Sequence, residues 1–169
     1  MERFLYRLSK SPHESKFVLK GAMVLRAWNP TTYRTTRDID LLGNITNDPG
    51  EVVKVIQQVR RQSIEPDGLE FDPDTARGET IMEDGDYRGA LASFLGHLGK
   101  ARANMQIDVG FGDTVTPAPV GIAYPVLLEF PVPRLSAYPP ETAIAEKFEV
   151  MLKRGAANSR MKDYHDLRW

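Results

Sequence analysis

Apolar positions recur along the chain at two different spacings, which predict a mixture of helices and strands. Spacing of three to four residues predicts helices over 1–10, 22–28, 50–62 and 141–154, and a last one from about 159. Alternation and short apolar runs predict strands over 17–19, 38–42, 79–83, 88–96 and 103–111, the last two as a hairpin. A connector with seven prolines, residues 117–140, is expected to hold one strand near Val126–Phe130.

The helix predicted over 141–154 carries an apolar face with a lysine at its edge. The apolar residues at helical spacing are Ile144, Phe148, Met151 and Leu152. Lys147 beside them either extends its ammonium group to water or points it into a cleft.

Composition excludes several classes of protein. The 169 residues, 41% hydrophobic and 27% charged, fit one globular domain. The absence of cysteine excludes disulfides, thiolate metal sites and a cysteine nucleophile, and three scattered histidines argue against a histidine metal cage. No apolar run approaches the roughly 20 residues of a membrane span, and no signal peptide is recognisable. We therefore expect a soluble cytoplasmic protein.

Charge is distributed unevenly around a formal net charge of -1. Both ends are basic, whereas nine acidic residues lie between Glu65 and Asp86, opposed only by Arg77. We interpret this acidic run as a solvated loop, and a contact for a basic partner is the alternative. If the two ends fold against each other, their basic residues line one cleft.

Carboxylates at alternate positions suggest a metal site. Asp38 and Asp40 project from the same face of a predicted strand, so their charges repel each other unless one stays protonated. A divalent cation such as Mg²⁺ removes that conflict, and Asp108, on another alternating strand, offers a third oxygen ligand. The alternative is a solvent-facing pair at a strand end.

A glycine turn precedes the second predicted helix. In Lys20-Gly21-Ala22 the glycine permits close approach of a ligand, and the helix N-terminus favours phosphate. Three carboxylates and such a turn meet the needs of two-metal phosphoryl transfer, namely ligands for two cations and a cradle for a triphosphate. Asp113, after Gly112, is interpreted as a turn residue.

Five ordered motifs resemble the AbiEii/AbiGii toxin family of nucleotidyltransferases, in the polymerase-β-like superfamily, over residues 16–168. The motifs are Phe17–Ala22, Arg34–Leu41, Gln106–Asp113, Glu141–Lys147 and Ser159–Leu167. Ala22 departs from the family's Gly or Ser, which removes a hydroxyl contact to phosphate but leaves the backbone N–H. The resemblance implies an α/β (α+β) fold with a mixed, mostly antiparallel central sheet flanked by helices. It also implies a core over 1–133 and a helical part over 134–169 that closes the cleft.

The resemblance also implies roles for individual residues. Asp38, Asp40 and Asp108 would hold Mg²⁺ (or Mn²⁺), and Lys147 would bind triphosphate oxygens. The remaining expected nucleotide-binding residues are Lys20, Gly21, Ala22, Thr36, Arg160 and Lys162. Asp163 would be an essential carboxylate, either a general base for the acceptor hydroxyl or a clamp that orients Lys147, and Asp166 is a second candidate. Thr36 alternatively caps a loop.

The function implied is a bacterial toxin that transfers a nucleotide from an NTP to RNA and releases pyrophosphate. The expected acceptor is a tRNA 3′ end, with inhibited growth when a cognate antitoxin is lacking. Because the chain stops inside a predicted helix at Trp169, we expect a fragment or a short family member. Two alternatives remain: transfer to a small molecule or a protein hydroxyl, and an inactive fragment that binds a nucleotide or a partner.

Overall fold

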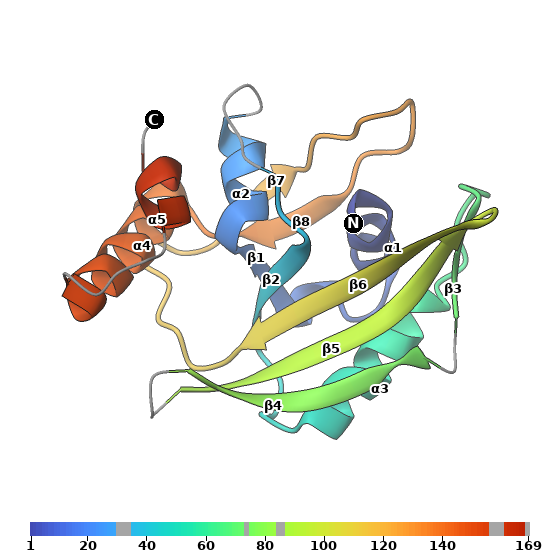
Figure 1. Cartoon of the computed structure of the whole chain (residues 1–169). Helices are drawn as coiled ribbons and strands as arrows, with labels where there is room; N and C mark the ends of the chain where they lie inside the picture. The colour runs from blue at the N-terminus through green and yellow to red at the C-terminus, as the bar shows by residue number, and fades with distance from the viewer. Residues whose placement is uncertain (30–34, 73–74, 84–86, 156–160, 168–169) are drawn as a thin grey trace.

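The computed structural model is described for residues 1–29, 35–72, 75–83, 87–155 and 161–167 (Figure 1). The helices are α1 (Glu2–Lys10), α2 (Gly21–Trp28), α3 (Pro49–Arg60), α4 (Pro140–Arg154) and α5 (Met161–Asp166), with a short 3₁₀ turn at Glu14–Lys16. The strands are β1 (Phe17–Lys20), β2 (Asp38–Gly43), β3 (Leu69–Phe71), β4 (Arg77–Glu83), β5 (Tyr87–Leu98), β6 (Ala101–Gly110), β7 (Val120–Ala123) and β8 (Arg134–Ala137). None of the described helices is long and apolar enough to cross a membrane.

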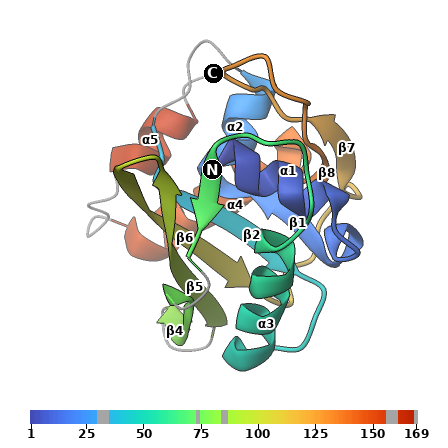
Figure 2. The same cartoon turned by 90° about the vertical axis from the view of Figure 1, so that its right-hand side faces the viewer.

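All eight strands join one mixed sheet, in the order β3-β5-β6-β2-β1-β8-β7, with β4 paired to β5. The β1–β8 and β2–β6 pairs are parallel, and the other described pairs are antiparallel. Figure 2 shows α3 on one side of strands β4–β6, and Figure 1 shows α4 and α5 beside α2, away from those strands. The predicted fold class, a mixed and mostly antiparallel sheet flanked by helices, is confirmed.

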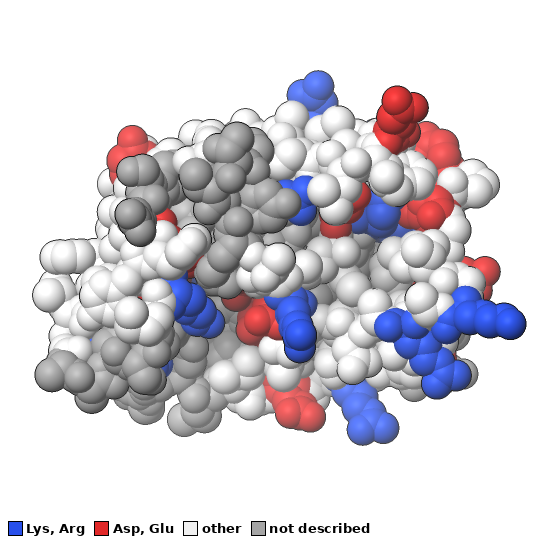
Figure 3. Space-filling view, turned by 45° about the horizontal axis from the view of Figure 1, so that its top comes forward, with Lys and Arg blue, Asp and Glu red and all other residues white. Residues whose placement is uncertain are grey.

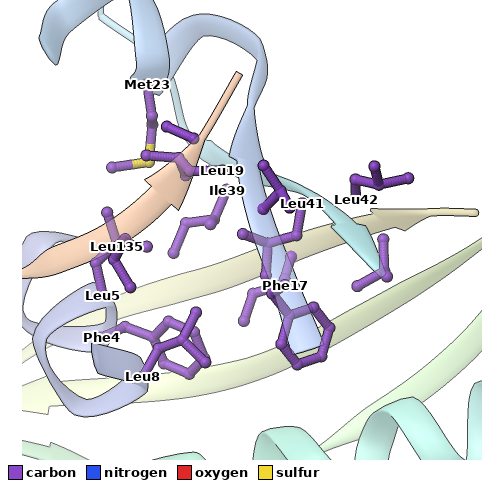
Figure 4. Packing of buried hydrophobic residues seen from close by; sticks show 14 of the residues in the cluster. Phe4, Leu5, Leu8, Phe17, Leu19, Met23, Ile39, Leu41, Leu42 and Leu135 are labelled. Atoms are coloured by element: carbon purple, nitrogen blue, oxygen red, sulfur yellow. The ribbon is translucent and has the colours of Figure 1, made fainter. Parts of the chain in front are cut away.

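Alternation along the central strands separates the core from the site. Leu19 of β1, Ile39 and Leu41 of β2 and Ile107 of β6 are at most 1% exposed and form the core with Phe4 of α1 (Figure 4). Because successive side chains of a strand point to opposite faces, the intervening polar residues are directed to the other side of the sheet. Burial of each such aliphatic side chain stabilises the fold by roughly 1.5–3 kcal/mol, which fixes the register of the polar residues as well.

The proline-rich connector folds differently from its prediction. The strand expected at Val126–Phe130 is wrong: this apolar run lies in the loop between β7 and β8, where Leu127 and Leu128 are exposed. Pro125 and Pro131 flank the run and supply no N–H for a ladder, so the strands form on either side of it.

Helix α4 turns its apolar face outward. Ile144 is 40% exposed, Phe148 54% and Leu152 67%, whereas Lys147, at the edge of this face, is buried. The side of α4 that faces the protein therefore carries charged and small residues, and the lysine points into the structure rather than to water.

The acidic run is only partly the solvated loop that we expected, because β3 and β4 form within it. Asp67, inside the run, accepts hydrogen bonds from Arg3 Nε at 2.9 Å and from Arg7 Nη1 at 2.7 Å. Burial opposes ionisation of Asp67, but these two guanidinium groups and the N–H of Leu69 outweigh it and lower its pKa to about 2. These two ion pairs hold α1 against the turn before β3.

We expect Asp67→Asn to lower the free energy of unfolding by about 3–5 kcal/mol at pH 7, because it leaves two buried guanidinium groups without their anion. In the wild type this contribution is present above pH 4 and is lost as the pH falls toward 2, because the pKa of Asp67 is depressed in the folded state. Urea unfolding at several pH values measures both effects. Glu129→Gln, at an exposed carboxylate, is the matched control, and equal losses in the two variants would contradict the assignment.

Candidate functional site

The three predicted metal carboxylates meet on one face of the sheet. The register of β2 and β6 places Asp40 opposite Asp108 and Asp38 opposite Gln106, and β1 places Lys20 opposite Asp40. Residues paired across a ladder point to the same face, so the carboxylates of Asp38, Asp40 and Asp108 share one side. The structure thus brings together the residues that the sequence pattern selected.

Asp40 lies in an unfavourable position for a charged carboxylate. Burial raises its pKa, the neighbouring carboxylate of Asp108 raises it further, and Lys20 opposes both effects. With smaller contributions from Asp38 and Glu146, the result is a pKa of about 6. A cation would stabilise a half-buried anion beside other anions.

Gly21 allows Asp40 to occupy this position. Its φ is +66°, and a Cβ atom built there would lie 2.1 Å from Oδ2 of Asp40. Any side chain at residue 21 would therefore displace the carboxylate, in addition to the strain of the left-handed backbone. The predicted glycine turn therefore provides the space that the Asp40 carboxylate occupies. Ala22, the next residue, is buried in the core.

Lys20 is held by two carboxylates that the sequence analysis did not assign to the site. Its Nζ lies 2.7 Å from Oδ2 of Asp113 and 2.6 Å from Oε1 of Glu146. The hydroxyl of Tyr138 donates a second hydrogen bond to Asp113 at 2.8 Å. Burial acts to lower the pKa of Lys20, but Glu146, Tyr138 and Asp113 outweigh it and raise the pKa. Asp113 is thus a partner of Lys20, beyond the turn role expected for it.

The pairing of Lys20 and Glu146 links α4 to the core. No periodic pattern marked Glu146, although it directly precedes Lys147 in a motif of the chain. The contact spans 126 residues of sequence, so only the folded chain reveals it.

Lys147, next to Glu146 on α4, points to α5 instead. Its Nζ donates to Oδ2 of Asp166 at 2.7 Å and lies 3.6 Å from Oδ1 of Asp163. Both carboxylate side chains are 2% exposed. Asp166, the second candidate by sequence, thus makes the shorter contact. Two buried acids around one lysine hold the ammonium group in a fixed place.

The structure describes only some of the other expected nucleotide-binding residues. The hydroxyl of Thr36 accepts a hydrogen bond from the N–H of Asp38 at 3.4 Å, which matches a loop-capping role. Lys162 is exposed at the start of α5. Arg160 and Arg34 lie outside the described residues, so their roles stay predictions.

The donor set fits a hard divalent cation. Asp38, Asp40 and Asp108 supply only carboxylate oxygens, and the pKa of Asp40 is raised by its removal from water and by the neighbouring charge of Asp108. Among the residues that the structure describes, no group of three or more is already arranged to coordinate a metal ion. Side-chain adjustment would therefore accompany binding.

Two solved structures from Helicobacter pylori share this fold. One is JHP933, with a TM-score of 0.61 and 15% identity, covering 98% of this chain and 60% of that chain. The other is described as a candidate nucleotidyltransferase, with a TM-score of 0.58 and 15% identity, covering 98% and 62%. This chain therefore spans about three fifths of the length of these structures. No curated protein matches it.

Family membership rests on the sequence as a whole. The profile of the family described as nucleotidyl transferase AbiEii toxin, type IV toxin–antitoxin system, matches residues 3–169. That range contains every candidate residue of the site. The chain belongs to the AbiEii nucleotidyltransferase toxin family.

Proposed function

We propose that this protein is a Mg²⁺-dependent nucleotidyltransferase toxin that moves a nucleotide from an NTP to an RNA acceptor. The observation that carries the proposal is Asp40, half-buried opposite Asp108 and against Gly21, where a cation would stabilise its ionised form. Family membership supplies the reaction class and predicts a cognate antitoxin as a partner.

In the proposed reaction an acceptor oxygen forms a bond to the α-phosphorus of the NTP, and the bond from that phosphorus to the bridging oxygen breaks. The acceptor hydroxyl loses its proton and pyrophosphate leaves. Asp38, Asp40 and Asp108 would hold Mg²⁺, which supplies charge stabilisation for the phosphates and a more acidic acceptor hydroxyl. Gly21 leaves space for the Asp40 carboxylate, and Lys20 offsets part of its charge.

Lys147 would neutralise triphosphate oxygens from the α4 side of the site. Asp166 and Asp163 keep its ammonium group in position before the nucleotide binds. Asp163 also lies against this nitrogen, at 3.6 Å. The family motif offers it either as the base that takes the proton of the acceptor hydroxyl or as a second clamp for Lys147, and both roles are proposals.

The direct test incubates the protein with Mg²⁺, each α-labelled NTP in turn and total bacterial RNA. We expect label to enter small RNA, with tRNA as the main product, and Asp38→Asn to lower the rate roughly 10³-fold. Glu129→Gln is the matched control and keeps the wild-type rate. Transfer of label to a small molecule or a protein would contradict RNA as the acceptor. Absence of transfer from every NTP would contradict the enzymatic proposal.

A second prediction concerns the lysine of α4. We expect Lys147→Gln to lower kcat by about 10²–10³-fold, because the cation proposed to neutralise the triphosphate oxygens is lost. Lys153→Gln, on the same helix but in an exposed ion pair with Glu149, is expected to keep the wild-type rate. Steady-state kinetics are measured at a temperature where circular dichroism shows both variants folded. Equal rates for the two variants would contradict the role of Lys147.

A further inference from the structure

The sheet face that carries the catalytic carboxylates continues well beyond them. Residues of β6 that share the face of Asp108 are Gln106, Asn104 and Arg102, at alternate positions. On β5 the register places Leu91, Ser93, Leu95 and His97 opposite Asp108, Gln106, Asn104 and Arg102 respectively. We call these seven residues, together with Asp108, the polar track.

No described helix covers the polar track. In Figure 1 the broad face of β4, β5 and β6 is uncovered, and Figure 2 places α3 behind it. Accordingly, Asn104 and Arg102 are exposed, and Leu91, Ser93 and Leu95 are half-buried. The opposite positions Ala92, Phe94 and Ile107 are buried in the core. The fold therefore keeps one side of a long hairpin open beside the site.

Charge changes sign along the track. The track starts at Asp108, which pairs with Asp40 of β2, and ends at Arg102. Lys100 is exposed in the turn that follows β5. Figure 3 shows acidic side chains near the middle of the molecule and a group of basic side chains at its right-hand end. Arg102 lies six positions from Asp108 along β6, which corresponds to about 20 Å of strand.

The chemistry of each position suits an extended strand of nucleic acid. Arg102 and Lys100 can bind phosphates, Ser93 and Asn104 can hydrogen-bond to sugars or base edges, and Leu95 offers apolar contact to a base. The amide of Gln106 already donates to Oδ1 of Asp108 at 3.3 Å, which joins the track to the carboxylates. A small acceptor would instead need a concave and largely enclosed pocket.

We propose that the polar track binds the single-stranded 3′ end of the RNA acceptor and delivers its terminal hydroxyl to the carboxylates. This inference rests on the proposed function and adds the surface that the acceptor occupies. Glu70 lies beside His97 and Glu79 beside Leu91, so acidic residues border the track. Few phosphates are contacted in consequence, and the affinity for RNA is modest and sensitive to salt.

The test compares two double variants of surface cations. Lys100→Gln/Arg102→Gln removes the cations at the end of the track, and Lys54→Gln/Arg61→Gln removes two exposed cations of α3 and the residue after it, behind the sheet. The substrate is a short single-stranded RNA with a free 3′ hydroxyl, presented with Mg²⁺ and the NTP that gives transfer. Its affinity is measured by fluorescence anisotropy at several salt concentrations without nucleotide.

We expect the track variant to raise KM for RNA about tenfold, with kcat at saturating RNA and KM for the NTP unchanged. The slope of log affinity against log salt should fall by about 1.4, since two phosphate contacts are lost. The α3 variant should behave as the wild type. Wild-type kinetics and an unchanged slope in the track variant, or equal effects in both variants, would overturn the inference. Absence of transfer by the wild type would instead contradict the proposed function.

Discussion

The placement of Asp40 opposite Asp108 is the constraint on which the site depends. Removal from water and the carboxylate of Asp108 on the neighbouring parallel strand raise the pKa of Asp40 to about 6, so its ionised form is disfavoured in the folded chain. The rest of the site accommodates this cost. Gly21 leaves room for the carboxylate, and Lys20 places a positive charge beside it. The hydrophobic side of the same strands fixes this geometry, because a register shift would expose Ile39.

Helix α4 joins the carboxylates to the C-terminal helix through two consecutive residues. Glu146 reaches Lys20 at the end of β1, and Lys147 reaches Asp166 of α5. Successive helical residues diverge by about 100°, so one helix can satisfy both elements. The price is that the apolar side of α4, which includes Phe148, faces outward. Ion pairs rather than apolar packing therefore set the position of Lys147 relative to the three carboxylates of the sheet.

Sequence periodicity predicted the features that depend on local geometry. Alternation placed Asp38 and Asp40 on one strand face, and a glycine before a helix marked residue 21. It could not reveal partners such as Asp113 for Lys20, because that contact joins residues 93 positions apart. Apolar content alone wrongly predicted a strand at Val126–Phe130, because the prolines on either side cannot donate hydrogen bonds to a sheet. Likewise, the amphipathic pattern of α4 located an apolar face but not the direction in which the structure turns it.

The change in thermal stability on adding a divalent cation tests most directly whether a bound cation compensates the negative charge of Asp40. In EDTA at pH 7.5 we expect Asp40→Asn to melt at a higher temperature than the wild type, because ionised Asp40 costs up to about 3 kcal/mol. Saturating Mn²⁺ should then raise the Tm of the wild type and leave that of the variant unchanged, with a gain of about 2.7 kcal/mol at 100 times Kd. Equal responses of the two proteins to Mn²⁺, or no response of the wild type, would contradict the account.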